Sequence, residues 1–271
     1  MQPTANGVAF MRESWNVSRL SEAAADGERY VSSIVLKPML ERELPTPDAF
    51  ATCPSDGNIL TYYAGTFESV YIIFHPFIKP VSIEPEEFSP QTYPDRLSIL
   101  KTCEPVSWAE VAKLAMLPSM AAIDVGLRTS IGGLKKELAN QEYARKIDEL
   151  FESHGIISPP EGFFSDLNHD TVLEAIRDLG YQWIWVGDEF CTERKLYWIE
   201  DLKAESATAT SRCHRNVFTP DNALLWTTHW DSHFSFLCSS KANLLAIQQR
   251  MGFEGFFCTP RNRGLLERGG T

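Results

Sequence analysis

Glycine-rich motifs that bind phosphates or cofactors are absent from this chain. It contains no G-x-x-x-x-G-K-[ST] segment, no G-x-G-x-x-G between an expected strand and helix, and no G-x-S-x-G elbow. Such motifs bring backbone amides close to phosphates or expose a nucleophilic serine on a tight turn. We therefore expect no cofactor, and no local motif is specific enough to name a reaction.

Paired cysteines and long apolar runs are missing as well. The N-terminal segment has no apolar signal-peptide core, and no run approaches the roughly 20 apolar residues that a membrane helix needs. Neither a zinc framework nor a redox dithiol is expected, because no C-x-x-C spacing occurs. These absences favour a cytoplasmic protein with no membrane partner. Its six cysteines are widely spaced and read as reduced thiols: Cys53, Cys103, Cys191, Cys213, Cys238 and Cys258.

Positive charge is scarce. Lysine and arginine total 25 against 36 aspartates and glutamates, which gives a formal net charge of −11. A nucleic-acid-binding protein normally needs a basic face to neutralise backbone phosphates. We therefore expect no nucleic acid among the partners of this acidic chain.

Length and apolar content allow a substantial core. With 271 residues, 44% of them hydrophobic, the chain fits one large domain or two small ones. The segment Ser158-Pro159-Pro160 gives the clearest internal boundary. The predicted parts are an N-terminal helix and loop extension at 1–66, a strand and helical region at 67–158, an α+β module at 159–260 and a flexible tail at 261–271.

Local patterns predict a strand and then a helical middle. Residues 29–37 fit a peripheral helix or a strand, and the prolines and glycines of 41–66 indicate a long loop. SVYIIF at 69–74 is typical of a buried strand. Ser107 and Glu110 occupy the capping-box positions, so a helix should begin there, break near Pro118 and resume to about residue 152, either straight or bent at Gly132-Gly133. A helix-turn-helix regulator is one alternative for this region.

The last part of the chain predicts a compact hairpin, helix and strand. Apolar residues alternate through 224–238, so this stretch forms either a hairpin of 223–230 with 233–238 or one long strand. A helix follows the N-cap Ser239-Ser240, Gly252 ends it, and 253–258 forms another strand. With a second, aromatic hairpin at 181–200, the expected class is α+β with an antiparallel sheet.

The sharpest candidate site is His229, Asp231 and His233. Imidazole and carboxylate groups bind divalent metals, and alternate residues of a strand share one face. Along a straight strand the two histidines stand roughly 13 Å apart, so a bend would be needed for both to reach one ion. If 224–238 is one continuous strand, this face is opposite the alternating aromatic residues, and both histidines are then expected to be accessible to solvent, a partner or a ligand.

Cys213 and His214 form a second candidate, of nucleophilic type. A thiol and an imidazole can form a catalytic pair when the base activates the nucleophile. Adjacent residues of an extended chain point apart, however. A surface loop with an incidental cysteine is the plainer interpretation.

Three stretches resemble an uncharacterised bacterial family of unknown function, the domain-of-unknown-function family numbered 2711. They are HPFIKP at 75–80, VSWAEV and LRTSIGGLKKEL within 106–138, and WDSHFSFLCSS and GFEGFFC within 230–258. The resemblance implies membership of a sequence group with no known mechanism, so it transfers no functional residue.

The sequence therefore favours a cytoplasmic bacterial binding protein, of immunity or resistance type, whose partner is an unknown protein or small-molecule ligand. Its function would reside in surface shape rather than in motifs. The main alternative is an enzyme that uses a divalent metal at His229, Asp231 and His233. The regulator is the second alternative.

Overall fold

The computed structural model describes residues 48–55, 57–206 and 216–262. All of them belong to one compact unit, Pro45–Thr271. The predicted helix or strand at 29–37, the tail from 263 onward, and Cys213 and His214 lie outside the described residues. Within the described part, no helix is both long and apolar enough to cross a membrane.

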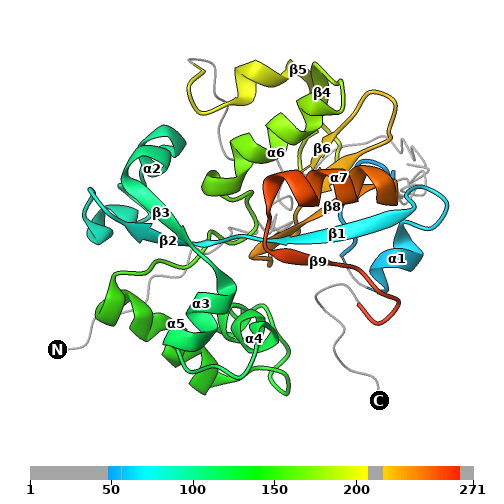
Figure 1. The fold of residues 1–271 in the computed structure, drawn as a ribbon. Coiled ribbons are helices and arrows are strands. Elements are labelled where there is room, and N and C mark those ends of the chain that lie inside the picture. Colours follow the sequence, from blue (N-terminus) through cyan, green and yellow to red (C-terminus); the bar gives the residue numbers. More distant parts are fainter. Residues whose placement is uncertain (1–47, 56, 207–215, 263–271) are drawn as a thin grey trace, which may run out of the picture. The chain divides into compact units, whose positions relative to one another are not determined.

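A seven-stranded antiparallel sheet organises the unit (Figure 1). Its strand order is β5-β4-β6-β7-β8-β1-β9, so β1 from the first half of the chain pairs with β8 and β9 from the last quarter. The segments 67–158 and 159–260 thus share one sheet. The strands are β1 Ser69–Phe74, β4 Trp183–Gly187, β5 Arg194–Trp198, β6 Asn216–Phe218, β7 Leu225–Thr227, β8 Phe234–Ser239 and β9 Gly255–Phe257.

A second, two-stranded sheet pairs β2 (Phe77–Pro80) with β3 (Cys103–Val106). The seven helices of the described part are α1 Ile59–Tyr62, α2 Arg96–Thr102, α3 Trp108–Leu114, α4 Met120–Ser130, α5 Gln141–His154, α6 Asp166–Asp178 and α7 Lys241–Met251. Together the elements confirm the predicted α+β class.

Two predictions about the helices are wrong in part. The long helix expected to resume after Pro118 is two helices, α4 and α5, because Gly132 takes a left-handed φ of 72° and ends α4. The loop expected at 41–66 contains the short helix α1, which Asn58 caps by accepting from the Thr61 amide.

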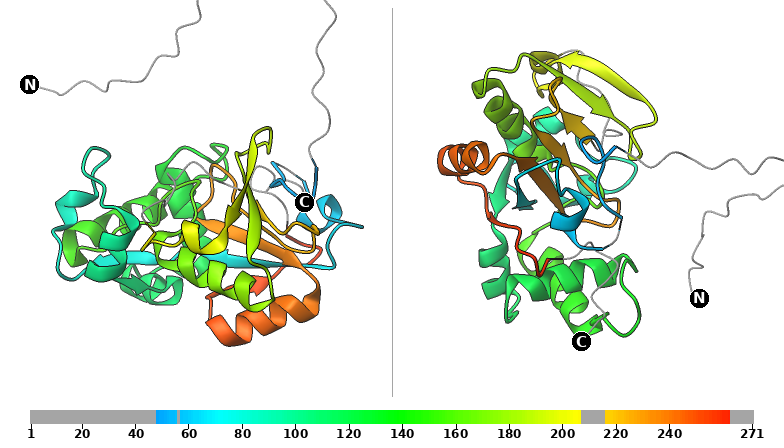
Figure 2. Two further views of the ribbon diagram at one scale, coloured as in Figure 1. Left: turned by 90° about the horizontal axis from the view of Figure 1, so that it is seen from above. Right: turned by 90° about the vertical axis from the view of Figure 1, so that its right-hand side faces the viewer.

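Both faces of the sheet are covered by helices. Ile72 and Phe236 pack on one face with Trp108 of α3 and Leu127 of α4. Tyr71, Ile73 and Leu237 belong to a second core, which packs against α6 and α7. In Figure 1, α3, α4 and α5 group below β1 and α6 and α7 lie above it; in both views of Figure 2, α7 in orange lies apart from the green α3–α5 helices.

The predicted start of α3 is confirmed, with an additional cap from a distant residue. The Glu110 amide donates to Ser107 Oγ at 3.1 Å. The amides of Trp108 and Ala109 donate to the Glu254 carboxylate at 2.6 and 2.9 Å. Glu254 precedes β9, so its charge-assisted hydrogen bonds fasten the first turn of α3 to the end of the sheet.

Candidate functional site

A cavity of about 540 Å³ lies where α3 and α4 meet the sheet beside β1, β8 and β9. Ligand pockets commonly have volumes of about 300–1,000 Å³ and mainly apolar walls with a few placed polar groups. Residues far apart in the sequence line this one: Ile59, Ile72, Phe74, Trp108, Ser119, Met120, Ala121, Asp124, Arg128, Phe234, Gly255, Phe256 and Asn262.

Aromatic side chains build the apolar wall. Phe74 of β1 lies directly opposite Phe234 of β8, and Phe256 lies on the adjoining strand β9. The Phe74 ring stacks on Trp108 with centroids 4.4 Å apart and meets Phe256 edge-on at 5.7 Å. Trp108 is fixed in turn, because its Nε1 donates to the backbone oxygen of His75 at 2.7 Å. The wall is therefore held in place before any ligand binds.

One face of α4 supplies the charged part of the cavity. Ala121, Asp124 and Arg128 are spaced i, i+3 and i+7, which places them on one side of a helix. Arg128 Nη2 donates to Asp124 Oδ2 at 3.1 Å, and the two side chains are 1% and 12% exposed. A buried ion pair loses much of its Coulomb energy to desolvation, so it is weak evidence for a purely stabilising role.

Gly126 fixes the position of this helix. A Cβ atom there would lie 2.6 Å from Ile147 Cδ1 and 3.0 Å from the Tyr143 backbone of α5. The missing side chain lets α4 pack closely on α5 through one face. Its opposite face can then present Asp124 and Arg128 to the cavity.

His229 and His233 are buried, so the accessibility expected for a continuous strand is not found. Their exposed fractions are 2% and 3%. The predicted hairpin alternative is confirmed: β7 and β8 pair, and the Ser232 amide donates to the His229 backbone oxygen in the turn between them. The parity argument fails because helices cover both faces of the sheet, and all six residues of β8 are buried.

The local contacts of the predicted metal trio are to backbone groups. His229 Nδ1 accepts from the Asp231 amide at 3.1 Å, and His233 Nδ1 lies 2.9 Å from the Pro159 oxygen. Among the described residues, no three side chains of His, Cys, Asp or Glu are arranged so that they could hold a metal ion. The geometry therefore gives the metal hypothesis no support. The other candidates, Cys213 and His214, fall in the undescribed 207–215.

Sequence reasoning missed a buried histidine pair next to the cavity wall. His75 follows Phe74 and His233 precedes Phe234, its antiparallel partner, and the His75 amide donates to the His233 oxygen at 3.1 Å. Desolvation, aided by the neighbouring His233, lowers the pKa of His75 to about 3. Desolvation lowers the pKa of His233 to about 4. The hydrogen bond to the Pro159 carbonyl oxygen opposes this shift, and the nearby Arg128 charge adds to it. Both rings are therefore neutral at physiological pH.

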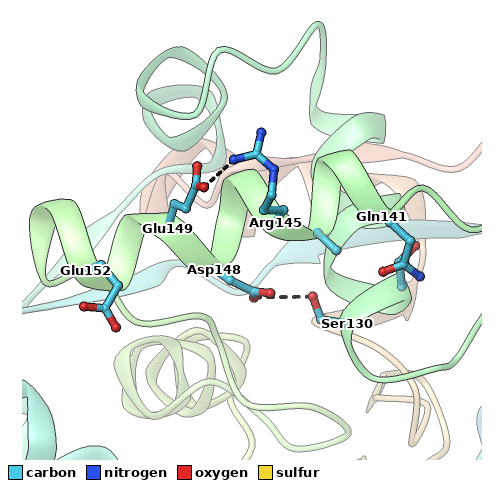
Figure 3. A pocket seen from close by; sticks show the side chains of 8 residues that line it. Ser130, Gln141, Arg145, Asp148, Glu149 and Glu152 are labelled. Atoms are coloured by element: carbon cyan, nitrogen blue, oxygen red, sulfur yellow. Dashed lines mark hydrogen bonds and ion pairs between the residues drawn. The ribbon is translucent and has the colours of Figure 1, made fainter.

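A second depression, of about 460 Å³, lies on the outer surface of α4 and α5 (Figure 3). Several of its polar groups are already paired: Ser130 donates to Asp148 at 3.4 Å, and Arg145 pairs with Glu149 and with the neighbouring Glu142. Arg145 and both glutamates are more than half exposed. Exposed pairs of this kind contribute little energy and are typical of a solvated helix face, so we do not place the functional site here.

Comparison with known proteins places the cavity in a recognised sequence family. The chain is 21% identical over 209 residues to the protein named "Uncharacterized protein YwbB" from Bacillus subtilis (strain 168), an alignment that covers 75% of this chain and 92% of that protein. No solved structure matches the chain. The family model described as "Protein of unknown function (DUF2711)" matches residues 55–263, a range that contains every residue lining the cavity. The chain belongs to the DUF2711 family.

Proposed function

We propose that this protein binds a small organic molecule in the cavity between α3, α4 and the sheet. The observation that carries the proposal is a 540 Å³ pocket whose walls come from six elements and whose charged pair is buried on α4. The volume suits a molecule the size of a metabolite or drug. The stacked Phe74 and Trp108 rings support binding with little loss of side-chain entropy.

The sequence also allowed a protein partner, and with it an immunity or resistance role. Both remain predictions. No contact among the described residues favours a protein partner over a small ligand. A bacterial source, which the Bacillus subtilis relative supports, and a cytoplasmic location remain predictions in the same way.

The regulator alternative has less support than the small-ligand proposal. Seven of the eleven residues of α4 are buried, among them Ile123, Leu127 and Arg128. A recognition helix must present one face to the major groove of DNA. This helix is packed against the sheet, α3 and α5, and the net charge of −11 opposes approach to phosphates.

Filling the cavity should weaken the binding of a neutral apolar probe. Ala121 is an exposed residue at the second position of α4 and lines the cavity. We expect N-phenyl-1-naphthylamine to fluoresce on binding the unmodified protein, and Ala121→Trp to weaken its affinity at least about tenfold, which corresponds to about 1.4 kcal/mol. The measurement is a fluorescence titration at neutral pH.

The matched control is Ala242→Trp. Ala242 is also exposed and also occupies the second position of a helix, α7, but it does not line the cavity. This variant should bind the probe as the unmodified protein does. Equal affinity in both variants, or no probe binding to a cooperatively folded protein, would contradict the proposal.

A further inference from the structure

The polar lining of the cavity carries both signs of charge and no net charge. Asp124 supplies a carboxylate and Arg128 a guanidinium, and the remaining polar residues of the lining, Ser119 and Asn262, are neutral. From this composition we infer that the ligand carries an uncharged polar head with adjacent hydrogen-bond donors and acceptors, such as a carboxamide or the edge of a heteroaromatic base. The inference rests on the proposed function and narrows its ligand class.

The position of the ion pair disfavours a head that carries charge of one sign only. An anionic head that approached Arg128 would also meet the Asp124 carboxylate, whose Oδ2 lies 3.1 Å from Arg128 Nη2. A cationic head at Asp124 would meet Arg128 in the same way. Like charges repel more strongly beside largely buried groups such as these than in bulk water, because solvent screens them less.

A neutral head with a donor and an acceptor meets no such repulsion. A carboxylate accepts hydrogen bonds and a guanidinium donates several in one plane, so an amide-like edge matches the pair in both directions. A site that contains buried polar groups discriminates against ligands that cannot form hydrogen bonds with them.

The aromatic wall opposite the ion pair indicates the apolar part of the ligand, which we call its body. Phe74, Phe234 and Phe256 present rings on the sheet side, and Met120 at the start of α4 is among the exposed apolar side chains. Flat aromatic bodies pack well against rings in offset or edge-on geometry, and a methionine adapts to irregular shapes. The expected ligand is therefore a planar aromatic body with an amide-like head.

Three probes with one body and different heads test this inference. 2-Naphthamide is neutral with a donor and an acceptor, 2-naphthoate is anionic, and 2-naphthylmethylamine is cationic. We expect the amide to bind at least about tenfold more tightly than either charged probe, measured by calorimetry and by displacement of N-phenyl-1-naphthylamine. Tighter binding of either charged probe, or equal affinities of all three, would overturn the inference.

A variant changes the charge of the site. Asp124→Asn leaves Arg128 as the charged group of the lining, so the preference should shift from the amide toward 2-naphthoate. Asp148→Asn on α5, outside the cavity, is the control and should keep the amide preference. An unchanged order in a folded Asp124→Asn protein would count against the pair as the head-binding group. Should that variant fail to fold, the comparison of three probes on the unmodified protein decides.

The outcomes separate the inference from the function on which it rests. If N-phenyl-1-naphthylamine binds and none of the three probes displaces it, the head recognition is wrong while binding in the cavity stands. If neither that probe nor the naphthyl series binds, both the function and the ligand class are overturned.

Discussion

Lowering the pH from neutrality to about 5 should reduce the free energy of unfolding by about 4 kcal/mol through His75 and His233 together. Their folded-state pKa values, about 3 and about 4, lie below the ordinary value of 6.5. Below pH 6.5 the unfolded chain therefore takes up protons that the folded protein does not. Stability is complete above 6.5 and falls by about 1.4 kcal/mol per pH unit for each ring until the folded pKa is reached. That loss is large against a typical stability of about 5–15 kcal/mol.

Urea unfolding at a series of pH values between about 7 and 5 measures this slope before most carboxylates titrate. In a His75→Gln and His233→Gln double variant the histidine part of the slope should disappear, even if the variant is less stable at pH 7. His154→Gln, at an exposed position of α5, should keep the full slope. An unmodified protein whose stability is flat over this range would show that the two rings are not held neutral by burial.

Gly255→Ala should be among the most destabilising single substitutions, at about 3 kcal/mol. A Cβ atom on Gly255 would lie 1.9 Å from the backbone oxygen of Ile72 in the neighbouring strand. The clash is with backbone, so β9 must move away from β1, with which it pairs at Ile73. That movement also displaces Glu254, the cap of α3, and Phe256, part of the cavity wall.

The effect is measured as the shift of the urea midpoint together with the affinity for N-phenyl-1-naphthylamine. Gly133→Ala is the control, since its Cβ would approach other heavy atoms no closer than 3.3 Å, the first of them in the Ile131 side chain. We expect the control to change stability by less than about 1 kcal/mol. Equal stabilities of the two variants would mean that β9 is not held as closely to β1 as the structure shows.

The sequence allowed the fold to be predicted wherever a local rule decided the structure. The β-branched run at 69–74 is a strand of the same bounds, and Ser107 caps α3 as its capping-box position indicates. The order of hairpin, helix, glycine and strand after residue 224 is also confirmed. In each of these segments the local preference and the tertiary contacts agree.

The prediction from sequence failed where helices cover both faces of the sheet, because apolar alternation was taken to mean that only one face is covered. Alternation along β8 was interpreted as one buried and one accessible face, which holds for a sheet covered on one side. Here α3 and α4 cover one face while α6 and α7 cover the other, and all six residues of β8 are buried. Alternation alone does not show how many faces of a sheet are covered.

The cavity could not be predicted because its residues are brought together only by the tertiary fold. Trp108, Arg128 and Phe256 lie in the sequence stretches that carry the family resemblance, but nothing in those stretches indicates that they meet. The pairing of β9 with β1 and the packing of α4 through Gly126 decide that arrangement. The cavity could have been predicted only if the pairing of β9 with β1 had been known.

Methyl NMR of the protein with bound 2-naphthamide tests the central claim most directly. With the methionine and isoleucine methyl groups labelled, we expect intermolecular nuclear Overhauser effects from the naphthyl protons to Met120, Ile59 and Ile72, which line the cavity. Met116, which is more exposed than Met120 but lies outside the lining, should show none. Effects to Met116 alone, or none to the three lining methyl groups under saturating ligand, would contradict binding in this cavity.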